Sequence, residues 1–323
     1  MAKTPLYEAS TQFKNWRYSP ESLAQVRTSL NAAAVAVIRN TFEADEPGSS
    51  SAVSFLTPEE ELLLVRLYVS KITQLCGFFR FPEEVEATAV SYLKRFYLKN
   101  TVMDWHPKNV MLTALFLATK TTNNPISLEA YTDNIPKTSP SDVLDLEFLV
   151  AQSLGFEFAA WHAHRALWGI WLDLQCIPEA PPARAAAQSD IYDAALRHVR
   201  TSRLSDAELI YTPSQIALAS LSIFSTLQST LAPIRSLIQA SARPVDVESV
   251  RGVDLRLKLC KNPEKVVGSK AYLAKKAEDE RKAEEKRTRK AEDVQKAMTD
   301  GDPFGDELGG QRSLVDYDDD DDD

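Results

Sequence analysis

The fold is decided by one stretch, Met103-Asp-Trp-His-Pro-Lys-Asn-Val-Met-Leu-Thr-Ala-Leu-Phe-Leu-Ala-Thr-Lys120. Proline at position 107 suits the first turn of a helix, and the residues after it are apolar on almost every side until Lys120. A helix that is apolar all round must be buried among other helices. The stretch therefore predicts the central helix of a helical bundle.

A second stretch, from Thr212 to Phe224, repeats this layout. The matched pairs are Pro107 and Pro213, Val110 and Ile216, Leu112 and Leu218, Leu115 and Leu221, and Leu117 and Ile223. Two such helices at matched positions predict two copies of one all-helical domain.

Helix caps and apolar spacing predict the remaining elements. Thr57, Ser139 and Thr212 each stand before a proline and are interpreted as helix N-caps rather than phosphorylation sites. The predicted helices cover about 22–38, 58–75, 82–98, 107–120, 128–134, 140–154, 162–172, 183–201, 213–227 and a segment beyond 245. No run of alternating apolar and polar residues is long enough to demand a sheet.

The chain is accordingly divided into five parts. These are an N-terminal extension with a helix (1–55), a first repeat (56–158), a second repeat (159–245), C-terminal helices with a charged arm (246–299), and a disordered acidic tail (300–323). In the arm, pairs such as Glu278 with Lys282 and Glu285 with Arg289 stand four residues apart and favour a solvated helix.

Composition narrows the possible functions. The net charge is −9, but residues 300–323 carry eleven acidic side chains against Arg312 alone. The net charge of the rest of the chain is therefore close to +1. Direct nucleic-acid binding is not expected from so nearly neutral a core. No stretch reaches the ~18 consecutive apolar residues of a membrane span, and the N-terminus lacks an apolar signal region, so no membrane association is expected. Cys76, Cys176 and Cys260 are widely spaced and are expected to be reduced, buried residues of an intracellular protein.

No catalytic residue, metal site or cofactor site is predicted. His162 and His164 are two apart, which would place them on different sides of a helix, and no further ligand stands at a suitable spacing. His106 precedes Pro107 and is expected to be a cap or packing residue. The chain has neither a glycine-rich phosphate loop nor a nucleophile elbow, so it is not expected to be an enzyme.

Three longer motifs make the chain resemble the cyclin family, and within it the H-type branch that regulates CDK-activating kinases. They are Ser91-Tyr-Leu-Lys-Arg-Phe-Tyr-Leu-Lys-Asn-Thr-Val-Met-Asp-Trp-His-Pro107, Leu204-Ser-Asp-Ala-Glu-Leu-Ile-Tyr-Thr-Pro-Ser-Gln-Ile-Ala-Leu218 and Ser10-Thr-Gln-Phe-Lys-Asn-Trp16-Arg-Tyr-Ser. The resemblance covers roughly residues 6–260 and implies an all-α fold of two tandem five-helix cyclin boxes.

The resemblance also implies a kinase-binding surface. In cyclins, a lysine that ends the third helix and a glutamate in the fifth bind the kinase, and these positions fall on Lys120 and Glu147. Apolar contact residues after that glutamate fall on Leu154, Phe156 and Phe158. The chain departs from the family pattern in having Thr121-Thr-Asn123 after the lysine and only Ala151 one turn after the glutamate.

The implied partners are a cyclin-dependent kinase catalytic subunit, a RING-finger assembly subunit and the core of transcription factor IIH. The implied role is activation of that kinase, without catalysis by the chain itself, to phosphorylate the C-terminal domain of RNA polymerase II in the nucleus. Two alternatives stay open: another transcriptional cyclin of the C, K or T kind, and a cyclin-fold nucleic-acid adaptor resembling transcription factor IIB. The scattered cysteines and the nearly neutral charge outside the tail disfavour the adaptor.

Overall fold

The computed structural model describes residues 5–176, 185–221 and 228–299, and over these residues the protein contains helices and no strand. Three predicted parts lie outside the described residues: the acidic tail, the first two residues of the predicted helix 183–201, and the helical residues 222–227, which include Ile223. The chain divides into two units, Met1–Lys265 and Val266–Asp323.

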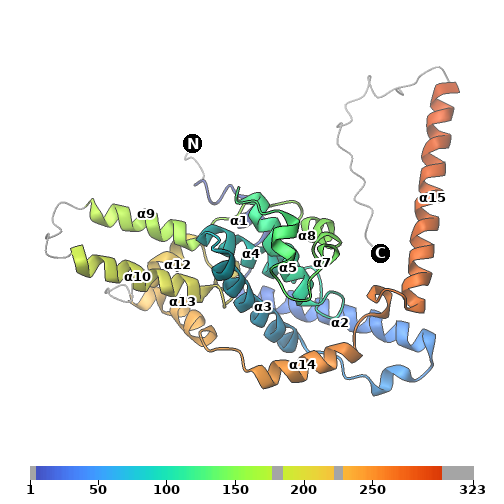
Figure 1. Ribbon diagram of the computed structural model, residues 1–323, viewed down its shortest axis with the longest axis horizontal. Helices are drawn as coiled ribbons and strands as arrows, with labels where there is room; N and C mark the ends of the chain where they lie inside the picture. The colour runs from blue at the N-terminus through green and yellow to red at the C-terminus, as the bar shows by residue number, and fades with distance from the viewer. Residues whose placement is uncertain (1–4, 177–184, 222–227, 300–323) are drawn as a thin grey trace. The chain divides into compact units, whose positions relative to one another are not determined.

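Most of the helices belong to the first unit (Figure 1). The N-terminal extension holds α1 (Thr11–Asn15), α2 (Pro20–Asp45) and the short 3₁₀ helix η1 (Ser49–Ala52). The first repeat holds α3 (Pro58–Phe79), α4 (Glu83–Phe96), α5 (Pro107–Thr121), α6 (Leu128–Thr132), α7 (Pro140–Leu144) and α8 (Glu147–Ser153). The second repeat holds α9 (Ala163–Gln175), α10 (Ala185–Ser202), α11 (Ala207–Ile210), α12 (Pro213–Leu221) and α13 (Gln228–Ser241), and α14 (Val247–Leu259) and the 3₁₀ helix η4 (Pro263–Lys265) follow.

Helix starts follow the predicted caps. Thr57 accepts a hydrogen bond from the backbone N–H of Glu60, and the Glu60 carboxylate accepts one from the N–H of Thr57 at 3.0 Å. Thr212 and Gln215 make the same reciprocal pair at the start of α12, at 2.9 and 3.2 Å. Each cap satisfies N–H groups that the helix itself leaves without acceptors.

The predicted helix over 140–154 is wrong in one respect, because it is broken into α7 and α8. The hydroxyl of the buried Thr113 donates to the carbonyl of Val143 at 2.9 Å. In an uninterrupted helix that carbonyl would accept from the N–H of Glu147. A side chain inserted into the backbone ladder therefore ends α7, and Glu147 becomes the first residue of a new helix.

Two other expectations need correction. Helix α13 was not among the predicted elements, because Pro233 lies inside it and proline normally interrupts a helix. Cys76 and Cys260 are buried as expected, but Cys176 is exposed because it follows the last turn of α9.

The first repeat is built around α5, in which every residue from Val110 to Thr119 is buried. Helices α3, α4, α7 and α8 pack directly on α5, and α14 returns to pack on α3. Helix α3 is long and apolar enough to cross a membrane by length and composition alone, yet it begins with Glu59, Glu60 and Glu61 and contributes Leu64, Val69 and Ile72 to this core. The prediction of a central apolar helix is confirmed.

The second unit contains α15 (Lys270–Thr299), whose described side chains are almost all exposed. The predicted pair of Glu278 and Lys282 is present at 3.1 Å, whereas Glu285 lies 3.9 Å from Arg281. Such pairs each stabilise a helix by a few tenths of a kcal/mol, so α15 is a solvated helix stabilised by its own charges.

Candidate functional site

Lys120 and Glu147, the two polar kinase-binding positions that the resemblance implies, lie in contact with each other. Their Nζ and Oε1 atoms are 2.5 Å apart, and their side chains remain 42% and 25% exposed. Lys120 stands in the last turn of α5 and Glu147 begins α8, so each charge has the sign that its helix end favours. The ammonium also lies 4.5 Å from the centre of the Phe116 ring, which restricts where it can point. The break between α7 and α8 thus places a carboxylate beside the end of the central helix.

An exposed aromatic pair follows this ion pair. Phe148 and Phe156 are 70% and 55% exposed, and their rings meet edge to face with centres 6.1 Å apart. Phe156 in turn contacts Phe158 at 6.3 Å, and Phe158 contacts the fully buried Tyr92 at 6.2 Å. The four rings run from the core to the surface, so the outer two are supported from below.

The backbone turn that presents Phe156 is well defined. Gly155 and Phe156 have φ angles of +60° and +58°. The N–H of Phe156 donates to the carbonyl of Ala151 at 2.9 Å, and the N–H of Gly155 to that of Gln152 at 2.8 Å, which is the bonding pattern of a Schellman cap. Glycine adopts such an angle readily, but a phenylalanine there is strained by about 1 kcal/mol or more, and such outliers cluster at functional sites.

Leu154 does not belong to the exposed surface, and its prediction as a contact residue is corrected. Its side chain is fully buried, as is that of Val150 one turn earlier. Both point into the core under α8, which leaves no Leu154 surface for a partner. Phe158 is half-buried and packs against the same core.

Phe148 was missed because no family position pointed to it. A signal was nevertheless present in the spacing of α8. Val150 and Leu154 define the buried face, and Phe148 stands two residues before Val150, which rotates it by about 200° away from that face. A large aromatic residue out of phase with the buried positions of a short helix is a candidate for binding a partner.

Tyr92 joins the two parts of this surface. Its hydroxyl donates to the carbonyl of Phe158 at 2.7 Å and lies 3.0 Å from the hydroxyl of Thr121, next to Lys120. Burial raises the pKa of Tyr92, so it stays a neutral donor. The linker that carries Phe156 and Phe158 is therefore fixed to the end of α5.

The N-terminal segment holds the same linker from the other side. Glu157 accepts hydrogen bonds from Asn15 at 2.5 Å and from the indole N–H of the buried Trp16 at 2.6 Å. Gln12 accepts from the N–H of Trp161 at 2.6 Å and donates to its carbonyl at 3.2 Å. The Ser10–Ser19 motif thus holds the connection between the two repeats, and we call it the clasp.

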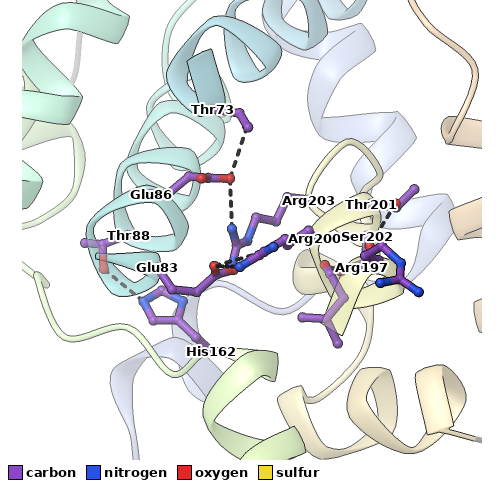
Figure 2. Close-up of polar contacts among 11 residues, drawn as sticks. Thr73, Glu83, Glu86, Thr88, His162, Arg197, Arg200, Thr201, Ser202 and Arg203 are labelled. Atoms are coloured by element: carbon purple, nitrogen blue, oxygen red, sulfur yellow. Dashed lines mark hydrogen bonds and ion pairs between the residues drawn. The ribbon is translucent and has the colours of Figure 1, made fainter. Parts of the chain in front are cut away.

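Arginines of α10 and the loop after it bind the N-terminal end of α4 across the junction of the repeats (Figure 2). Glu83 accepts from Arg200 at 2.7 Å and also pairs with Arg203, and Arg203 reaches Glu86 at 2.8 Å. The Arg203 side chain is only 9% exposed. Burial alone would raise the pKa of the Glu83 carboxyl, but the hydrogen bond from Arg200 and the charge of Arg203 hold it below its usual value.

His106, His162 and His164 make contacts within the fold. His162 and His164 stack with ring centres 5.4 Å apart, so the expectation that they lie on different sides of a helix is wrong, because His162 precedes α9 instead of lying within it. His162 pairs with Thr88 at 2.9 Å (Figure 2), and His106 caps α5 by accepting from the N–H of Lys108 at 3.1 Å. Burial lowers the pKa of His162 far below its usual value and that of His164 to about 4. Among the described residues, no group of three potential ligands could hold a metal ion.

Two family descriptions match the chain. Residues 54–159 match the cyclin N-terminal domain and residues 162–243 match the cyclin C-terminal domain. The cyclin mcs2 of Schizosaccharomyces pombe is 30% identical over 85% of this chain and 91% of its own length. The putative cyclin-H of Dictyostelium discoideum is 33% identical over 67% of this chain and 75% of its own length.

Solved structures give the same picture. A chain of the CAK complex of Chaetomium thermophilum bound to ATP-γ-S superposes with a TM-score of 0.70 and 27% identity, covering 80% of this chain and 90% of that one. A chain of the yeast TFIIK (Kin28/Ccl1/Tfb3) complex superposes with a TM-score of 0.57 and 28% identity, covering 79% of this chain and 98% of that one.

Proposed function

This chain belongs to the cyclin family, and from that membership we propose that it binds and activates a cyclin-dependent kinase of the CDK-activating and transcription factor IIH type. The complex would phosphorylate the C-terminal domain of RNA polymerase II. One observation supports the proposal: Lys120 and Glu147, at the positions where the family resemblance implies kinase contacts, lie against each other, and the exposed Phe148 follows Glu147 directly.

Activation requires more energy than the ion pair can supply. To shift a kinase from 1:99 to 99:1 in favour of its active form takes about 5.5 kcal/mol of differential binding. An exposed ion pair contributes about 0–1 kcal/mol. The remainder corresponds to about 200 Å² of additional apolar contact with the active form, at ~25 cal/mol per Å².

Phe148 and Phe156 can provide that contact. An aromatic side chain buries roughly 150–250 Å², and more than half of each ring is exposed here, so covering both would bury on the order of 200–300 Å². Because Phe148 contacts Phe156, and Phe156 contacts Phe158, little side-chain freedom is lost when a partner covers them. We infer that the aromatic pair supplies the energy and that Lys120 and Glu147 fix the register.

The chain would act without catalysis of its own, and the kinase would be its direct partner. A RING-finger assembly subunit and the core of transcription factor IIH are proposed as further partners, and the nucleus as the location. The support is that the superposable chains come from the CAK complex and from the TFIIK complex, the second of which consists of Kin28, Ccl1 and Tfb3.

The test is phosphorylation of a polymerase C-terminal repeat peptide by the purified kinase subunit, with and without this chain. We expect strong stimulation by the unmodified chain. The double variant Phe148→Ser and Phe156→Ser should reduce stimulation at least tenfold, and Lys120→Ala with Glu147→Ala should reduce it less. Phe78→Ser is the matched control, since Phe78 is also an exposed phenylalanine, 62% accessible, but lies on α3.

The proposal would be contradicted by a folded chain that leaves the kinase inactive, both alone and together with the RING-finger subunit. If Phe78→Ser reduced kinase stimulation as much as the double variant of Phe148 and Phe156, the chain would still be a kinase activator, but the aromatic pair would have no specific part in activation.

A further inference from the structure

A groove of about 580 Å³ lies where Tyr7, the connection between the repeats and both repeats meet. This is within the 300–1,000 Å³ range typical of ligand-binding pockets. Its lining includes Tyr7 from the N-terminal segment, Thr121 and Phe158 from the first repeat, Trp161 from the linker, and Arg165 and Ser214 from the second repeat. Arg165 is already paired with Glu84, so the groove does not demand a charged ligand.

One side of the groove is formed by residues 158–161, the connection between the repeats, and some of their backbone groups make no hydrogen bond within the described fold. Phe158 is tied to Tyr92 through its carbonyl, and Trp161 is tied to Gln12 through both of its backbone groups. Between them, Ala159 and Ala160 line the groove, and their N–H and C=O groups make no hydrogen bond within the described part of the chain. Backbone groups held in place at both ends and left without partners suit an extended peptide.

Two side chains add to this wall. The indole of Trp161 is 45% exposed and meets Tyr7 edge to face at 6.1 Å. The Tyr7 hydroxyl is buried and interacts with the side chain of Gln12, so Tyr7 contributes its ring to this wall and not a free donor. The groove therefore combines an aromatic surface for an apolar side chain with polar groups for a peptide backbone.

The groove is continuous with the kinase-binding surface. Thr121 follows Lys120 directly, Phe158 contacts Phe156, and the Tyr92 hydroxyl lies against both Thr121 and Phe158. A partner seated on Lys120 and Phe156 therefore reaches the groove without crossing another element.

We propose that the groove receives an uncharged, extended segment of the kinase partner, with an apolar side chain against Trp161 and backbone hydrogen bonds to Ala159 and Ala160. The inference rests on the proposed function, and it extends the kinase contact from the first repeat to the second. The second repeat then contributes directly to kinase affinity through the start of α12.

The experiment measures the dissociation constant of the purified kinase for the full chain by isothermal titration calorimetry. Ser214→Trp fills the groove from an exposed position, because Ser214 is the second residue of α12 and the cap is made by Thr212 and Gln215. Ala160→Pro removes one free N–H without breaking a hydrogen bond of the fold. Ser22→Trp is the matched control, an exposed serine in the first turn of α2.

We expect each groove variant to weaken kinase binding about tenfold and Ser22→Trp to leave it unchanged, with thermal unfolding used to show that all three remain folded. Unchanged affinity for both groove variants would overturn the proposal. Unchanged affinity with reduced phosphorylation of the polymerase peptide would also overturn it, because the occupant would then be the substrate. An unmodified chain that does not bind the kinase at all would instead refute the proposed function.

Discussion

The two repeats share a helix layout but differ in how deeply they bury it. Leu112 of α5 is 1% exposed, whereas its counterpart Leu218 of α12 is 39% exposed. The first repeat has one continuous core, which also includes Ile38 before it and Cys260 after it. In the part of the second repeat that the structure describes, the buried apolar residues fall into small separate clusters, among them one around Ile234 and Ile238 and one around Leu167 and Val199. A duplicated apolar pattern therefore predicts where a helix lies better than it predicts how deeply that helix is buried.

The largest expected effect follows from that pair of leucines. Leu112→Ala should lower the free energy of unfolding by about 2–5 kcal/mol, because it leaves a cavity in a close-packed core. Leu218→Ala should lower it by less than about 1 kcal/mol, because a partly exposed side chain leaves no enclosed cavity. Urea denaturation followed by circular dichroism measures both. Equal losses would mean that the second repeat buries Leu218 in solution and that the contrast is wrong.

A second prediction concerns the junction of the repeats. Arg203 is almost buried between Glu83 and Glu86, whereas Arg165 is 67% exposed beside Glu84. Arg203→Met should destabilise the chain by about 2–3 kcal/mol, since it leaves the partly buried Glu86 without its cation and leaves Glu83 with Arg200 alone. Arg165→Met should change stability by about 0–1 kcal/mol.

Thermal unfolding of the two methionine variants compares them directly. If Arg203→Met proved neutral, the second repeat would not depend on this network for its attachment to α4.

The sequence predicted the first repeat more completely than the second. The run of apolar residues in α5 and the caps at Thr57 and Thr212 are local signals, and the structure confirms them. The break before Glu147 could not be predicted, because it depends on the hydroxyl of Thr113 on a different helix. Helix α13 was missed for the opposite reason, since its local signal, Pro233, argues against the helix that tertiary packing stabilises.

At the proposed kinase-binding surface, too, local sequence signals were informative and contacts between distant elements were not. Lys120 and Glu147 were predicted through family motifs and lie in contact, although their role in kinase binding remains a prediction. Leu154 and Phe156 stand two residues apart and looked equivalent in the sequence. The Schellman cap at Gly155 separates them, leaving Leu154 in the core and Phe156 outside. Contacts across the fold, such as that of Trp16 with Glu157, had no sequence signal at all.

Acidic pH should lower the free energy of unfolding through protonation of His164 in the second repeat. Burial and the charge of Arg203 lower its pKa to about 4, while Glu83 and Glu84 act in the opposite direction and His162 stacks on the ring. The unfolded chain, with a histidine pKa near 6.5, binds a proton first, so stability is highest above about pH 6.5 and falls as the pH drops toward 4. At pH 5 the loss from His164 should be roughly 1–2 kcal/mol.

His164→Gln provides the check, because glutamine does not titrate. The free energy of unfolding of this variant should fall less between pH 7 and pH 5 than that of the unmodified chain. Parallel pH profiles would show that His164 has an ordinary pKa in solution.

The smallest expected effect belongs to the pair that matters most for the proposed function. Lys120→Ala and Glu147→Ala should each change the free energy of unfolding by less than about 1 kcal/mol, because both side chains are substantially hydrated. A loss of 2 kcal/mol or more on thermal unfolding would make this pair a structural support of the first repeat, comparable to Arg203. Changes in the free energy of unfolding close to zero, together with weaker kinase stimulation, would mean that the surface pair is dispensable for folding. The deeply buried core of the first repeat would then be sufficient to keep that repeat stable. The pair would then be free to serve a partner, which the junction arginines, committed to holding the two repeats together, are not.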